Sequence, residues 1–101
     1  ALNIKADEAL RIGLVNAVYT QEELLPAALK LAGKIAKNAP IAVRNCKKAI
    51  NEGLQVDIDQ AIVIEEKLFG GCFETEDQKA GMGNFLAPKE QKVKVVPFKN
   101  C

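Results

Sequence analysis

The side chains that could do chemistry in this sequence are carboxylates, lysines and thiols, because histidine is absent. Its absence excludes Ser–His and Cys–His nucleophilic pairs and removes the commonest metal ligand. Glu65 and Glu66 are adjacent, so on a helix they point about 100° apart and do not form a facing acid–base pair. Asp57 and Asp59 suit a helix start, where carboxylates offset the helix dipole. We interpret all four as structural or surface charges, and we expect no metal site.

Six basic residues and no acidic residue lie between positions 30 and 48. Lysine binds phosphate as a point charge, so a phosphate-bearing ligand is one interpretation of this stretch. Two solvated helix faces are the other interpretation. The stretch lacks the aromatic residues on which single-stranded nucleic acids stack. The net charge of +1 also argues against a protein that coats a polyanion. We therefore expect no nucleic-acid partner.

The three cysteines, Cys46, Cys72 and Cys101, are widely spaced and form no C-x-x-C pair. They indicate reduced thiols in a cytoplasmic protein, with Cys46 and Cys72 as small packing residues. The longest aliphatic run, residues 61–64, is far shorter than the ~20 apolar residues of a membrane span. We expect no membrane association. The sequence opens on Ala1 rather than Met, so a fragment of a longer protein is one interpretation.

The elements that position these side chains are helices, because apolar residues recur every three to four positions in five stretches. They span residues 6–12, 20–37, 40–53, 57–69 and 75–86. Thr20 with Glu23, and Thr75 with Gln78, have the spacing of a capping box. Gly13 and the pair Gly70–Gly71 mark helix ends.

Between and beyond these helices the pattern changes. Residues 14–19 are apolar and bounded by Gly13, which predicts a short buried extended segment that could be an edge strand. The stretch 57–69 is apolar around most of its circumference and should be the most buried helix. Residues 87–101 carry four lysines and one glutamate. We expect this tail to be mobile, although Val93, Val95 and Val96 could add a short strand or form a strap to another surface. The domain organisation is then 1–19, 20–86 and 87–101.

Four blocks of residues resemble the C-terminal third of enoyl-CoA hydratases, the crotonase family. They are ADEALRIGLVN at 6–16, NAPIAV at 38–43, KLF at 67–69 and TEDQKAGMGNFL at 75–86. The blocks occur in the family's order, and the pairing of EALRIGLVN with a closing T-x-D-x-x-x-G-M-x-x-F is specific. Within the family, the bacterial short-chain 3-hydroxybutyryl-CoA dehydratases are the most similar branch.

The resemblance implies an α/β spiral core followed by a C-terminal helical region, assembled as trimers or dimers of trimers. This chain looks like the second part only, so its own fold class should be all-α, a bundle of four or five helices. Residues 1–19 would be the end of the core. The family's two catalytic glutamates and its oxyanion hole belong to segments upstream of Ala1, so no catalytic residue is assigned here. Glu65 and Glu66 are refused that role.

The resemblance also implies three substrate-binding residues. Phe69 matches an aromatic that lines the acyl pocket, and Phe85 matches an aromatic near the CoA adenine. Lys89 is the candidate nucleotide contact, although relatives place this lysine in Phe-x-x-Lys and here it is displaced by one. Ordinary core packing is the alternative for both phenylalanines.

Three functions remain open from the sequence. The first is the C-terminal part of a lyase that interconverts 3-hydroxyacyl-CoA and trans-2-enoyl-CoA, acting on an acyl-CoA thioester without a cofactor. The part would need the crotonase N-terminal core, would be inactive alone, and would self-associate through exposed apolar surface. The second is a stand-alone helical oligomerisation or docking module without catalysis. The third is a small acyl-CoA-binding or nucleic-acid-binding protein that uses the basic residues 30–48. Acyl chain length, and the choice among hydratase, isomerase and hydrolase, are not determined.

Overall fold

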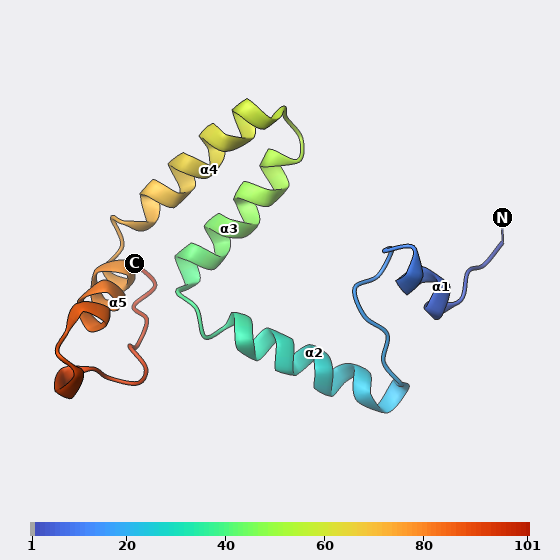
Figure 1. Cartoon of the computed structure of the whole chain (residues 1–101), viewed down its shortest axis with the longest axis horizontal. Coiled ribbons are helices and arrows are strands. Elements are labelled where there is room, and N and C mark those ends of the chain that lie inside the picture. Colours follow the sequence, from blue (N-terminus) through green and yellow to red (C-terminus); the bar gives the residue numbers. More distant parts are fainter. Residues whose placement is uncertain (1) are drawn as a thin grey trace. The chain divides into compact units, whose positions relative to one another are not determined.

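The computed structural model describes residues 2–101, and every regular element in that range is helical. The elements, drawn in Figure 1, are α1 (Ala6–Arg11), α2 (Gln21–Ile35), α3 (Pro40–Gly53), α4 (Ile58–Cys72), α5 (Glu76–Leu86) and a 3-10 turn, η1 (Lys89–Gln91). The predicted all-α class and the five predicted helices are confirmed. No helix in residues 2–101 is long and apolar enough to span a membrane.

The chain divides into two compact units, one ending at Ile35 and the other beginning at Ala36. In the first unit, the Glu8 carboxylate accepts two hydrogen bonds from the Arg11 guanidinium, at 2.6 and 2.7 Å. This contact holds the pKa of Glu8 below its ordinary value. Gly13 follows α1 with a φ of 75°, the left-handed conformation that favours glycine. The predicted helix stop at Gly13 is confirmed.

The segment from residue 14 to residue 19 differs from its prediction. It forms bends and irregular backbone, and its side chains are exposed, with Leu14 67% exposed. The backbone N–H groups of Leu14 and Val15 both donate to the Ala9 carbonyl, at 2.9 and 3.3 Å. The segment therefore turns back on α1. The described residues offer it no partner strand, and a strand needs a hydrogen-bonding neighbour.

The start of α2 follows the predicted capping pattern in part. The backbone N–H of Glu23 donates to the Thr20 hydroxyl at 3.3 Å, which satisfies one free donor of the first turn. The return contact runs from the Thr20 hydroxyl to the Glu23 carboxylate at 3.0 Å, not from the Thr20 backbone.

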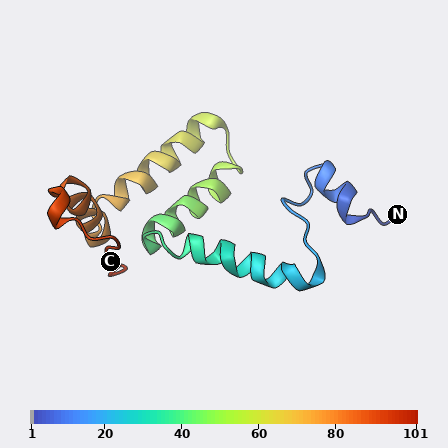
Figure 2. The ribbon, with the colours of Figure 1, turned by 60° about the horizontal axis from the view of Figure 1, so that its bottom comes forward.

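The second unit is built on an antiparallel hairpin of α3 and α4, which lie side by side in Figures 1 and 2. Asp57 caps α4 by accepting from the backbone N–H of Gln60 at 3.1 Å. At the turn end, a Cβ on Gly53 would meet the Ala61 Cβ at 3.4 Å, so the two helices approach closely there. The glycine pair 70–71 does not end α4, which continues to Cys72. Neither glycine takes a positive φ, so both stay helical.

Few side chains of this chain are buried. In residues 2–101 only Ala9 and Asp77 are buried, and the prediction that α4 would be the most buried helix is wrong. Val63 on α4 is 46% exposed, because α3 covers one face of an apolar helix and leaves the rest uncovered. Cys46 is exposed and Cys72 is half-buried, so the packing role predicted for Cys46 is also wrong.

Residues 92–101, here named the C-terminal strap, return along α5. Asp77 is 5% exposed and its carboxylate accepts from the backbone N–H groups of Lys99 and Asn100, at 2.6 and 2.9 Å. The Arg44 guanidinium of α3 donates to the Asn100 side-chain oxygen at 2.9 Å. The predicted strand at residues 93–96 does not form, and these hydrogen bonds instead hold the last residues as a strap; the mobility of residues 87–101 stays a prediction. The strap's backbone pairs with helix side chains in place of another strand.

Candidate functional site

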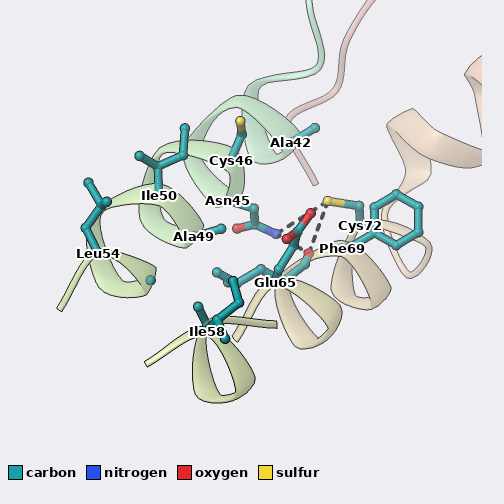
Figure 3. Close-up of a pocket in the computed structure, with 13 residues that line it drawn as sticks. Ala42, Asn45, Cys46, Ala49, Ile50, Leu54, Ile58, Glu65, Phe69 and Cys72 are labelled. Atoms are coloured by element: carbon teal, nitrogen blue, oxygen red, sulfur yellow. Dashed lines mark hydrogen bonds between the residues drawn. The ribbon is translucent and has the colours of Figure 1, made fainter. Parts of the chain in front are cut away.

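An apolar groove runs between α3 and α4 and encloses about 590 Å³ (Figure 3). Most of its lining is aliphatic, and its polar side chains are Asn45 from α3 and Glu65 from α4. On the α3 side of the groove, small residues such as Ala49 and Gly53 leave space between the two helices. Leu54 and Ile58 line the end of the groove near the turn. A groove of this size, mostly aliphatic with two polar side chains, suits a largely apolar group.

Asn45 ties the two walls of the groove together. Its side-chain amide donates to the Leu68 carbonyl at 3.0 Å and contacts the Cys72 sulfur at 3.5 Å. The Cys72 thiol donates to the same carbonyl at 3.4 Å. These contacts join the first half of α3 to the last turn of α4, as the dashed lines in Figure 3 show.

Phe69 lies at the edge of the groove, where the sequence predicts a substrate-binding residue. Its ring is 65% exposed and meets Phe73 in an edge-to-face contact with centroids 5.3 Å apart. It also lines a smaller pocket of about 360 Å³, shared with Glu65 and Glu66. The two glutamates are exposed, and no hydrogen bond in residues 2–101 joins them. The ring is not packed in a core of this chain.

Phe85 and Lys89 lie apart from the groove, since neither lines it. Phe85 is on the last turn of α5 and 70% exposed, while Lys89 opens η1 and is exposed. The predicted end of the last helix at residue 86 is confirmed, because α5 stops at Leu86. The structure therefore does not bring all three predicted binding residues into one pocket.

Sequence reasoning missed two residues beside Phe85. The Lys92 ammonium lies 5.3 Å from the Phe85 ring centroid, within the range of a cation–π contact. Asn84 donates to the Val93 carbonyl at 3.0 Å and accepts from the Val93 N–H at 2.8 Å. An amide in the last turn of a helix, followed by a lysine-rich segment, is the sequence feature that could have pointed to these contacts. Only the return of the strap along α5 brings the residues together.

The described residues offer binding surfaces of two chemistries. The groove presents aliphatic surface with one amide and one carboxylate, and the Phe85–Lys92 face presents an aromatic ring with a cation. Within residues 2–101 no group of three side chains is placed to hold a metal ion.

Comparisons with known proteins agree with the blocks found in the sequence. The sequence model of the enoyl-CoA hydratase/isomerase family matches residues 1–94. A short-chain-enoyl-CoA hydratase of Clostridium acetobutylicum is 54% identical over 100 residues, which are 99% of this chain and 37% of that protein. A crotonyl-CoA hydratase of Syntrophomonas wolfei is 55% identical over 87 residues, which are 86% of this chain and 34% of that protein.

Solved structures show the same likeness in three dimensions. An enoyl-CoA hydratase from Bacillus anthracis has a TM-score of 0.82 and 36% identity, covering 95% of this chain and 35% of that one. An enoyl-CoA hydratase/isomerase from Mycobacterium paratuberculosis has a TM-score of 0.84 and 28% identity, covering 97% and 37%. The chain thus spans about a third of the length of these relatives. It belongs to the enoyl-CoA hydratase/isomerase family.

Proposed function

We propose that this chain is the C-terminal part of an enoyl-CoA hydratase, a lyase that interconverts 3-hydroxyacyl-CoA and trans-2-enoyl-CoA plus water. Its substrate is a short-chain thioester such as crotonyl-CoA, in fatty acid or butyrate metabolism. The observation that carries the proposal is the 54% identity to a short-chain-enoyl-CoA hydratase over nearly the whole chain.

The chain contributes binding surface and assembly, and the rest of the enzyme contributes the chemistry. In this proposal Phe69 and the α3–α4 groove help to hold the acyl chain. Phe85 and Lys89 contact the CoA nucleotide. The catalytic glutamates and the oxyanion hole come from the other two thirds of the family's length, where general acid–base catalysis and enolate stabilisation are located.

The exposed apolar surface of the chain supports the proposal that the chain works together with the rest of the enzyme. Leu25, Leu29 and Leu31 on α2 are between 61% and 65% exposed. A contiguous apolar surface of this kind needs a cover. We assign that cover to the crotonase core and to neighbouring subunits of a homo-oligomer, a trimer or a hexamer, in the cytoplasm. Residues 1–19 belong to the core in this arrangement, 20–86 to the helical region and 87–101 to its basic tail.

The test is an assay of crotonyl-CoA hydration, which is monitored as the loss of the absorbance of the enoyl thioester. The complete protein that contains this chain should hydrate it, and the 101-residue chain alone should not. A complete protein that leaves crotonyl-CoA unchanged contradicts the proposal.

A second candidate, a stand-alone docking module, is favoured by the same exposed apolar face. The intact mass of the native protein, detected in its source cells with an antibody against this chain, separates the two. A polypeptide much longer than 10.9 kDa supports the hydratase, and a species of 10.9 kDa supports the module.

A further inference from the structure

The C-terminal strap brings a cation to an exposed aromatic ring. The Lys92 ammonium lies 5.3 Å from the centroid of Phe85, whose side chain is nonetheless 70% exposed. A ligand can therefore reach the ring and the ammonium group together. A flat aromatic group can stack on the ring, and a phosphate can pair with the ammonium group.

Asn84 fixes the strap at the residue that follows Lys92. Its amide nitrogen donates to the Val93 carbonyl at 3.0 Å, and its amide oxygen accepts from the Val93 N–H at 2.8 Å. Both backbone polar groups of Val93 are thus satisfied by one side chain. Because Lys92 directly precedes Val93, these two bonds also set where the Lys92 backbone lies.

The end of α5 explains why a strap residue occupies this place. The helix stops at Leu86, and Pro88 and η1 lead the chain away before it returns. Lys89 lies in η1, and within residues 2–101 Lys92 is the cation that lies over Phe85.

We infer that Asn84 is a positioning residue and that Lys92 is a binding residue for the aromatic, phosphate-bearing end of an acyl-CoA. Asn84 holds the Val93 backbone and so keeps the Lys92 ammonium beside the Phe85 ring. The inference rests on the proposed function for the identity of the ligand. The positions of the side chains are independent of that function, because they follow from the contacts among Asn84, Val93, Lys92 and Phe85.

The kinetic test uses the complete enzyme and crotonyl-CoA. Lys92→Ala should raise KM roughly fivefold and leave kcat unchanged, because a contact made equally in the ground state and the transition state is lost. Lys94→Ala is the matched control, since it removes the same charge from an exposed strap residue and should leave KM unchanged. Equal effects of the two variants would overturn the binding role of Lys92.

A double-mutant cycle tests the positioning role. Asn84→Ala should raise KM about as much as Lys92→Ala does, and should add nothing in the Lys92→Ala background. Independent, multiplying effects on KM would show that Asn84 does not act through Lys92, and would overturn the assignment.

Amide hydrogen exchange supplies a readout that does not need substrate. Exchange at Val93 should be faster in Asn84→Ala and unchanged in Lys92→Ala. Asn84→Asp keeps the acceptor for the Val93 N–H and loses the donor to the carbonyl, so its Val93 exchange should be intermediate. Should Asn84→Ala fail to fold, Asn84→Asp takes its place in the cycle. An unchanged Val93 exchange in a folded Asn84 variant overturns the inference.

The failure of this inference is distinguishable from the failure of the proposed function. An active wild-type enzyme whose Lys92→Ala variant has an unchanged KM keeps the function and overturns the inference. A wild-type enzyme that neither hydrates crotonyl-CoA nor binds free coenzyme A in calorimetry overturns both the function and the ligand named here.

Discussion

At the scale of single residues, Asp77 shows how one buried carboxylate binds a segment for which the sequence predicted a mobile tail, a strand or a strap. It lies in the first turn of α5, where the helix dipole favours an anion, and it accepts from two backbone N–H groups of the strap. The sequence contains this aspartate within the T-x-D block, but the pattern does not say which donors it meets. Those donors lie 22 and 23 residues further along the chain.

Removing the charge of Asp77 should release the strap. Asp77→Asn weakens two charge-assisted hydrogen bonds, each of a kind that contributes about 1.5–3 kcal/mol, and leaves an amide donor facing N–H groups. We expect faster amide exchange at Lys99 and Asn100 in the complete enzyme. Asp59→Asn, an exposed first-turn carboxylate on α4, is the control and should leave those amides unchanged. Equal protection in both variants would contradict the anchoring role.

Lys89 carries the residue-scale prediction made from the family resemblance. In the complete enzyme, Lys89→Ala should raise KM for crotonyl-CoA and change kcat little, because the lysine is expected to contact the nucleotide end equally in both states. Initial-rate kinetics at moderate salt measures this. An unchanged KM removes Lys89 from the binding site.

At the scale of elements, the sequence predicted starts better than ends. Thr75 and Asp57 cap α5 and α4 because a side-chain oxygen three residues before a free N–H satisfies it locally. Gly70–Gly71 was predicted to end α4 and does not, because neither glycine takes the left-handed conformation and the helix continues to Cys72. At this point Asn45 of α3 instead binds the Leu68 carbonyl and supports the last turn.

The inter-helix contact of Asn45 can be measured against a neighbour on the same helix. Asn45→Ala should destabilise the complete protein by about 1 kcal/mol in urea unfolding, the usual net worth of one hydrogen bond. Asn51→Ala, at an exposed position of α3, gives the same gain in helix propensity without that loss. The difference between the two variants therefore reports the hairpin contact. Equal stabilities would show that the contact contributes nothing.

At the scale of the whole molecule, the main feature of the chain is its exposed apolar surface. Only Ala9 and Asp77 are buried in residues 2–101, and apolar side chains on every α-helix are exposed. A domain of about this length buries well over half of its unfolded surface in one core. The chain by itself therefore leaves apolar surface on each α-helix that no core of the described residues covers.

Self-association of the isolated chain follows from that surface. Sedimentation of the purified 101-residue chain should give a mass above 10.9 kDa that rises with concentration, because apolar surface is removed from water on contact. Chaotropic salts at concentrations that do not unfold the chain should lower the mass measured by sedimentation. A monomer at every concentration would contradict the prediction.

The sequence by itself determined the helices and the caps, because these depend on residues three to four positions apart, and it carried the family blocks, which are runs of consecutive residues. Helical periodicity placed Phe69 on α4 and Phe85 on α5. The tertiary structure alone decided what the tail does. The Asn84–Val93 and Asp77–Asn100 contacts, and the position of Lys92 over Phe85, join residues 7 to 23 positions apart. Such contacts depend on where the chain turns after Leu86, and no local pattern encodes that path.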